Sequence, residues 1–212
     1  MSQGGGQGWT RRELVGGMAL FALVVGVPAA VATLESIEPA DAPSDRQRAL
    51  LREVAQLVIP RTETAGAGEA GVGDFVILAL EHGLDGSRKP LVVTPAIRDL
   101  PLRTDGSLRH LDWLERELDR RTRGDFLSRP LDDRRAALAA LDLASFPKDS
   151  PPPDPAPWRT IKALVLTGYY TSEAGASREL RFELVPGRWD PDVALRPGDK
   201  AWSSDWTAVE FG

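Results

Sequence analysis

Apolar residues recur at the 3.6-residue period of an α-helix in five stretches of the chain, and this pattern constrains the fold more than any other feature. Side chains spaced three and four positions apart share one face of a helix, so each stretch describes an amphipathic helix with one side for a core. The sequence therefore predicts an all-α fold, a small bundle of about five amphipathic helices. The apolar positions are Leu50, Leu51, Val54, Leu57 and Val58; Val72, Phe75, Val76, Ala79 and Leu80; Leu108, Leu111, Leu114 and Leu118; Leu131, Ala137, Leu138 and Leu141; and Trp158, Ile161, Leu164, Val165 and Thr167.

Capping residues indicate where these helices begin and end. Ser44 followed by Gln47 forms a capping box, which predicts a first helix over 45–59 that ends before Pro60. Glycine is favoured just after a helix because it adopts positive φ without steric cost. The other boundary residues are Gly83 and Gly124 after the second and third helices, Ser128 and Pro130 before the fourth, and Gly168, which we expect to end or loosen the fifth.

Residues 1–32 have the three-part layout of an export signal. Arg11 and Arg12 precede a modestly apolar run over 18–27, and small residues follow it. The run is shorter, and richer in glycine and alanine, than a transmembrane helix of about 20 apolar residues. A paired arginine in this position favours the twin-arginine route.

We therefore expect a twin-arginine signal peptide that engages the twin-arginine translocase. Ala30 and Ala32 are the small residues of the expected cleavage site, and cleavage follows Ala32. The mature protein is then expected in the periplasm, at the outer face of the inner membrane. An uncleaved N-terminal anchor and an ordinary secretory signal with a chance arginine pair are the alternatives.

The rest of the chain divides into a lead-in and one domain. Residues 33–44 hold prolines and acidic residues without periodicity, which predicts a linker, and 45–212 form the helical domain. The proline-rich segment 147–157 is expected to cross the surface in an extended form. The tail over 178–212 is also expected to be extended and irregular. Any single tail tryptophan can fill the domain's own core, but together they favour wrapping around a larger subunit. These tryptophans are Trp189, Trp202 and Trp206.

Composition excludes several kinds of chemistry. The chain has no cysteine, which rules out disulfides, thiolate nucleophiles and cysteine-ligated clusters. Its two histidines, His82 and His110, stand in no recognisable catalytic or metal-binding motif. The net charge of −5 argues against nucleic acid as a partner. We therefore predict no catalytic residues, no metal site and no cofactor in this chain.

One short pattern imitates a dinucleotide-binding site. Gly66, Gly68 and Gly71 satisfy the Gly-x-Gly-x-x-Gly spacing, and Asp85 follows at a suitable distance. That fingerprint needs a buried strand running directly into its first glycine, whereas the preceding segment has helical periodicity. We interpret it as a glycine-rich loop before a helix.

The export signal and the missing cofactor ligands have to be explained together. The twin-arginine route exports proteins that are already folded, commonly because they hold a cofactor or a partner. A chain with this signal but without cofactor ligands is therefore expected to be a subunit that holds a second, cofactor-containing chain.

Two longer motifs resemble a known family. The first runs from Leu57 through Val58-Ile59-Pro60-Arg61-Thr62 to Asp74-Phe75. The second is Gly168-Tyr169-Tyr170-Thr171-Ser172-Glu173, continuing to Pro186-Gly187. Both are similar to motifs of the gluconate 2-dehydrogenase subunit 3 family, and the segment 126–141 fits the helix between them. The resemblance covers most of 48–187.

The resemblance implies a mostly helical, non-catalytic small (gamma) subunit with a twin-arginine signal. Its partners would be a large FAD-containing dehydrogenase subunit acting on a sugar or polyol, with the FAD bound there, and in some complexes a multihaem cytochrome c subunit. Two departures stand out: family members often carry a cysteine after the Pro-Gly pair, which is absent here, and the tail after 190 has no counterpart. Because aromatic residues dominate interfaces, the partner-interface candidates are Gly168, Tyr169, Tyr170, Thr171, Ser172, Glu173, Trp189, Trp202 and Trp206.

Two other classes of function stay open on the sequence alone. One is a stand-alone periplasmic oxidoreductase or hydrolase whose site is built from carboxylates. The other is a structural protein of the cell envelope that is held by an uncleaved signal helix. A flavin or metal absorbance band in the isolated chain would favour the first, and an intact N-terminus at Met1 would favour the second.

Overall fold

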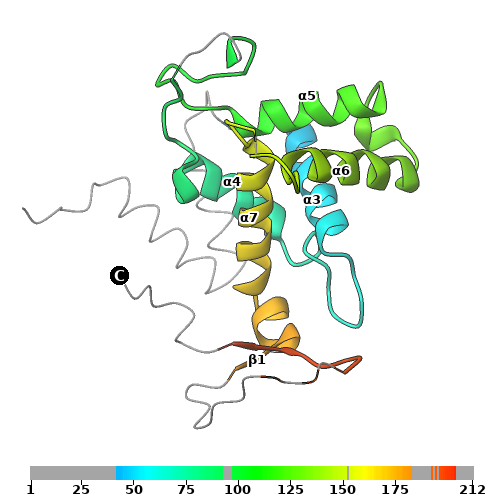
Figure 1. Cartoon of the computed structure of the whole chain (residues 1–212). Coiled ribbons are helices and arrows are strands. Elements are labelled where there is room, and N and C mark those ends of the chain that lie inside the picture. Colours follow the sequence, from blue (N-terminus) through cyan, green and yellow to red (C-terminus); the bar gives the residue numbers. More distant parts are fainter. Residues whose placement is uncertain are drawn as a thin grey trace, which may run out of the picture.

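The computed structural model describes residues 42–92, 97–151, 153–182, 192, 194 and 196–203. Five α-helices form a bundle, which confirms the predicted fold class (Figure 1). They are α3 (Asp45–Val58), α4 (Val72–Glu81), α5 (His110–Thr122), α6 (Leu131–Ser145) and α7 (Pro157–Tyr170). Short elements accompany them: the 3₁₀ turns η1 (Leu84–Gly86) and η3 (Phe126–Ser128), the π-helical turn η4 (Gly175–Glu179), and the strands β1 (Leu180–Phe182) and β2 (Ala201–Ser203).

Ser44, Gln47 and Gly83 act at helix ends as predicted, whereas Ser128 lies in η3 and does not cap α6. The amide of Gln47 donates to Oγ of Ser44 over 3.1 Å, and the amide of Ser44 donates to Oε1 of Gln47 over 3.0 Å. This reciprocal pair is the capping box of α3. Gly83 follows α4 with φ +82°, the left-handed conformation that glycine adopts without strain.

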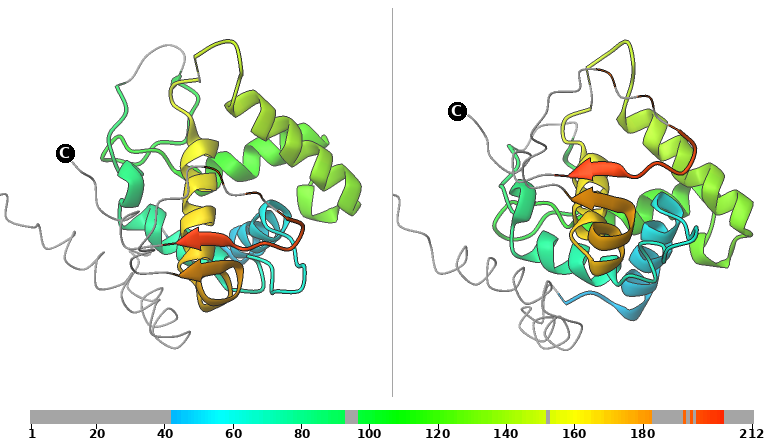
Figure 2. Two further views of the ribbon diagram at one scale, coloured as in Figure 1. Left: turned by 60° about the horizontal axis from the view of Figure 1, so that its bottom comes forward. Right: turned by 90° about the horizontal axis from the view of Figure 1, so that it is seen from below.

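The core lies where α3 and α7 pack against α4 and where α5 and α6 pack against α3 and α7. Nine of the ten residues of α4 are buried, because this helix is apolar on almost every side. Trp158, Tyr169 and Phe126 are the largest side chains that are completely enclosed. Figure 2 shows α7 crossing the bundle, with η4 and the two strands beyond its C-terminal end. The C-terminal end of α7 lies beside the loop that joins α3 to α4.

A buried ion pair fastens the segment after η1 to the bundle. Nη2 of Arg103 lies 2.5 Å from Oε1 of Glu81, and both side chains are almost fully enclosed. Arg88 approaches the other carboxylate oxygen of Glu81 at 3.3 Å, and Nη1 of Arg103 donates to the carbonyl of Leu108. Buried charges of this kind are tolerated only when their partners satisfy them, and Arg88 and Arg103 together satisfy the carboxylate of Glu81.

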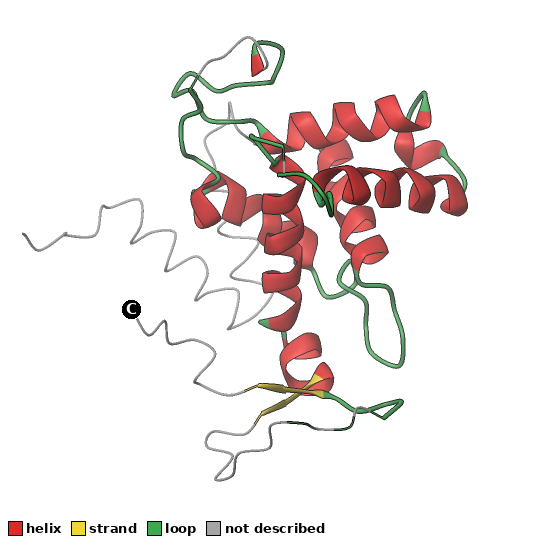
Figure 3. Ribbon diagram, in the orientation of Figure 1, coloured by secondary structure: helices red, strands yellow, loops and turns green. Residues whose placement is uncertain are grey.

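One prediction about the C-terminal half was wrong: Gly168 does not end the fifth helix, because α7 continues through it to Tyr170. The tail contains a feature that the sequence did not indicate. Leu180 pairs with Ala201 in a parallel two-stranded ribbon, the only strands among the described residues (Figure 3). Strands of three residues are too short for a period-2 pattern to reveal them.

Several sequence predictions lie outside the described residues. Arg11, Arg12, Ala30 and Ala32 of the export signal belong to this group, as do most of the linker and the residues Trp189 and Trp206. Within the described ranges, no helix has the length and apolar character that crossing a membrane requires.

Candidate functional site

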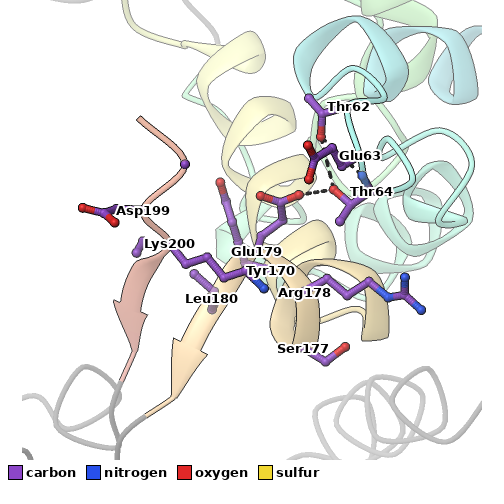
Figure 4. Close-up of a pocket in the computed structure, with 12 residues that line it drawn as sticks. Thr62, Glu63, Thr64, Tyr170, Ser177, Arg178, Glu179, Leu180, Asp199 and Lys200 are labelled. Atoms are coloured by element: carbon purple, nitrogen blue, oxygen red, sulfur yellow. Dashed lines mark hydrogen bonds between the residues drawn. The ribbon is translucent and has the colours of Figure 1, made fainter. Parts of the chain in front are cut away.

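The structure joins the two sequence motifs into one unit. The hydroxyl of Tyr169, at the end of α7, donates to the carbonyl of Ala65 over 3.0 Å. Oγ1 of Thr64 donates to the carboxylate of Glu179 in η4, and Figure 4 shows Glu179 directed toward this threonine. The loop that follows α3 is therefore held by side chains more than 100 positions further along the chain.

Gly168 permits the close approach of α7 to α4. A Cβ atom at this position would lie 2.5 Å from Cδ1 of Phe75, well inside van der Waals contact. Gly168 and Tyr169 are both buried, and Tyr169 is only 2% exposed. These two interface candidates thus pack within the protein's own core.

The other members of the second motif divide between support and surface. Ser172 is half-buried, and its hydroxyl donates to the carbonyl of Tyr169 over 2.6 Å. Tyr170, Thr171 and Glu173 are exposed, with Tyr170 at 43%. Their exposure leaves these three side chains available to a partner.

Trp202 is the one tail tryptophan among the described residues. It lies on β2 and is 46% exposed, with the guanidinium of Arg181 4.3 Å above its ring. A cation over the face of an indole is a stabilising arrangement. The strand pair therefore presents an indole and a guanidinium together at the end of the bundle.

An open groove of about 910 Å³ separates the first motif from the strand pair. Three short segments line it together with Tyr170: residues 62–64, 177–180 and 198–201. Arg178 and Lys200 face it alongside carboxylates, as Figure 4 shows. Its open shape and mixed charge suit a segment of polypeptide better than an enclosed small molecule, since small-molecule sites are concave and mostly apolar.

Three large apolar side chains on or next to α7 are exposed, and one of them, Tyr170, also lines the groove. Phe146, Leu166 and Tyr170 are 39%, 39% and 43% exposed. Nζ of Lys162 lies 4.8 Å from the centre of the Phe146 ring, and Cζ of Arg159 lies 5.0 Å from it. We call these five residues the α7 strip. The apolar spacing that predicts α7 marks only its inward side. Leu166 and Tyr170 are four positions apart, a spacing that places both side chains on the same outward face of the helix.

Asp142 anchors the strip to the core. Its Oδ1 accepts hydrogen bonds from Nε1 of Trp158 at 2.8 Å and from Nζ of Lys162 at 2.7 Å. Partial burial opposes the charge of this carboxylate, but the hydrogen bonds from Lys162 and Trp158 outweigh it and lower the pKa of Asp142. An ionised Asp142 therefore holds Lys162 against the Phe146 ring.

The residues considered for catalysis or cofactor binding have structural roles in the fold. α3 precedes the Gly-x-Gly-x-x-Gly segment in place of the required strand, and a Cβ on Gly68 would lie 2.5 Å from the carbonyl oxygen of Arg52. His82 caps the end of α4. His110 begins α5 and is buried. Within the described ranges, no three acidic or histidine side chains gather as a metal site would require.

His110 has a pKa well below its ordinary value. Burial lowers the pKa of His110 to about 4; the nearby carbonyl of Leu108 opposes this shift, and the charge of Arg103 adds to it. Nδ1 lies 3.1 Å from the carbonyl of Leu108. The imidazole is therefore neutral at neutral pH and belongs to the packed segment before α5.

The fold and the joined motifs define a small helical-bundle protein whose core is completed by its last helix, α7. Comparison with protein families identifies it further: the family described as gluconate 2-dehydrogenase subunit 3 matches residues 45–187, and the chain belongs to this family. The match starts at the first residue of α3 and includes all five helices and β1. Neither curated proteins nor solved structures gave a match.

Proposed function

We propose that this protein is the non-catalytic small subunit of a periplasmic, membrane-associated, FAD-dependent dehydrogenase of the sugar or polyol type. The family match across the whole bundle carries this proposal. In this function the chain binds the large FAD-containing subunit and stabilises it. The substrate and the flavin belong to that partner, and a multihaem cytochrome c subunit completes the complex where electrons pass on to the membrane.

The proposal includes an escort role during export. A flavoprotein folds around its cofactor in the cytoplasm, and a folded protein needs the twin-arginine route. One signal on the small subunit then serves both chains. This explains why Arg11 and Arg12 precede a domain whose sequence contains no cofactor-binding motif.

Co-purification tests this function directly. The chain would be tagged at its C-terminus, purified from the periplasm of its native cells, and its companions identified by mass spectrometry and visible absorbance. A large protein with a flavin spectrum and no signal peptide is the expected companion. Recovery of the chain alone, even after gentle crosslinking, would contradict the proposal.

A further inference from the structure

The outward side of α7 has exposed apolar side chains among its polar ones. Its inward side is buried through Trp158, Ile161 and Val165, yet Leu166 and Tyr170 remain exposed on its outward side. A surface helix normally turns charged and polar residues toward water. Leu166 and Tyr170 lie one turn apart, so their exposed side chains offer neighbouring apolar contacts to another protein surface.

The two charged side chains of α7 have the same sign. α7 contains the basic residues Arg159 and Lys162 and no acidic residue, although the whole chain carries a net charge of −5. Lys162 is bound to Asp142, while Arg159 has no carboxylate partner among the described residues. A partner with carboxylates opposite Arg159 would complement this face electrostatically.

The strand pair below α7 is also incomplete by itself. β1 and β2 have three residues each and pair only with one another in the described part of the chain. Two isolated strands are marginally stable in water, and parallel pairing is weaker than antiparallel pairing. Contact with a partner across Trp202 and Arg181 would stabilise the pair and bury an exposed indole.

We propose that the α7 strip, continued by Trp202 and Arg181, is the docking surface for the large flavoprotein subunit. This inference rests on the proposed function and adds where the partner binds and what its surface contains. The matching surface has an apolar centre against Leu166 and Tyr170 and carboxylates opposite Arg159 and Arg181. Aromatic residues and arginine dominate the energetics of such interfaces.

Paired variants of the full chain test this surface. Leu166→Glu and Tyr170→Ala are compared with Leu131→Glu, which alters a leucine of similar exposure, 42%, at the far end of α6. Recovery of flavoprotein per tagged chain is measured in the same cells, and thermal unfolding by circular dichroism checks that each variant is folded. The strip variants should reduce recovery at least about tenfold, and Leu131→Glu should leave it unchanged.

A second pair tests the charge complementarity. Arg159→Glu should weaken the complex and reduce its sensitivity to salt, whereas Arg116→Glu, on the exposed face of α5, should do neither. Normal recovery of flavoprotein by both strip variants overturns the docking surface and leaves the proposed function intact. Failure of the unmodified chain to recover any flavoprotein overturns the proposed function, and the docking surface with it.

A lipid surface is the other occupant that the experiment distinguishes. Purified chain is mixed with vesicles of phosphatidylglycerol and phosphatidylcholine and floated on a density gradient. No flotation, or flotation that Leu166→Glu leaves unchanged, supports the protein interface. Flotation that Leu166→Glu abolishes, together with an unaltered flavoprotein complex, assigns the strip to the membrane and overturns the proposal.

Discussion

The hydroxyl of Tyr169 donates a hydrogen bond to the carbonyl of Ala65, a residue 104 positions earlier in the chain. The same tyrosine ring is enclosed between the helices, while the ring of its neighbour Tyr170 is exposed and meets it edge-on at 5.3 Å. Two adjacent tyrosines therefore have opposite roles: one closes the bundle, and the other belongs to its surface.

Removing the hydroxyl from each tyrosine in turn distinguishes these two roles. Tyr169→Phe should lower the free energy of unfolding by about 1 kcal/mol, because it deletes one hydrogen bond and keeps the ring. Tyr170→Phe, the matched control, should leave stability unchanged because its side chain is exposed. Urea denaturation followed by circular dichroism measures both, and equal effects would contradict the assigned roles.

Even a methyl group at position 168 is expected to lower the stability of the protein. Alanine is the better helix former by about 1 kcal/mol, but its Cβ would press on the buried ring of Phe75. We expect Gly168→Ala to destabilise the protein by about 1–2 kcal/mol in net terms, since overpacking outweighs propensity here. Thermal unfolding measures this effect.

A compensating change provides the control for this prediction. Phe75→Leu should make Gly168→Ala less costly in the double variant than in the wild type, because the ring that it contacts is gone. Thr167→Ala, at the exposed neighbour, should be close to neutral. Simple additivity of the Gly168 and Phe75 changes would show that the two residues do not interact.

His110 should make the protein less stable in acid. Its pKa of about 4 in the folded state lies below the ordinary value of about 6.5, so the unfolded state binds the proton more readily. Its contribution is fully present above about pH 6.5 and is lost as the pH falls toward 4, by up to about 3 kcal/mol. His110→Gln should therefore show a shallower fall in urea midpoint between pH 7 and pH 4.5 than the wild type. Parallel pH profiles would contradict the buried, neutral imidazole.

Export should depend on the arginine pair. Arg11→Lys with Arg12→Lys should leave both this chain and its flavoprotein in the cytoplasm, while Arg116→Lys on α5 should not. Fractionation and immunoblotting measure the distribution, and mass spectrometry of the wild-type mature chain should start at Thr33. A flavoprotein that reaches the periplasm with the double variant would refute the shared signal.

The helices were predictable because their periodicity and caps are local. Ser44, Gln47 and Gly83 act where the sequence places them, and the predicted first helix, 45–59, differs from α3 by one residue at its end. Gly168 was misread because its role depends on Phe75, a neighbour in space and not in sequence. Thr167 was grouped with the inward side of its helix, but it is exposed.

The candidate site was only partly predictable. The second motif was recognisable as a string of residues, but burial alone separates Tyr169 from Tyr170. The groove combines three segments distant in sequence, and the α7 strip needs Phe146 from another helix. Such relationships depend on tertiary packing, which periodicity does not describe.

The position of α7 also determines when the bundle can form during synthesis. α4 is covered by α3, which is made before it, and by α7, which is made after α5 and α6. A nascent chain that has not yet emerged beyond α7 leaves the Phe75 side of α4 open to water. Contacts between such distant segments are slow to form, so the bundle is expected to close only after α7 has been made.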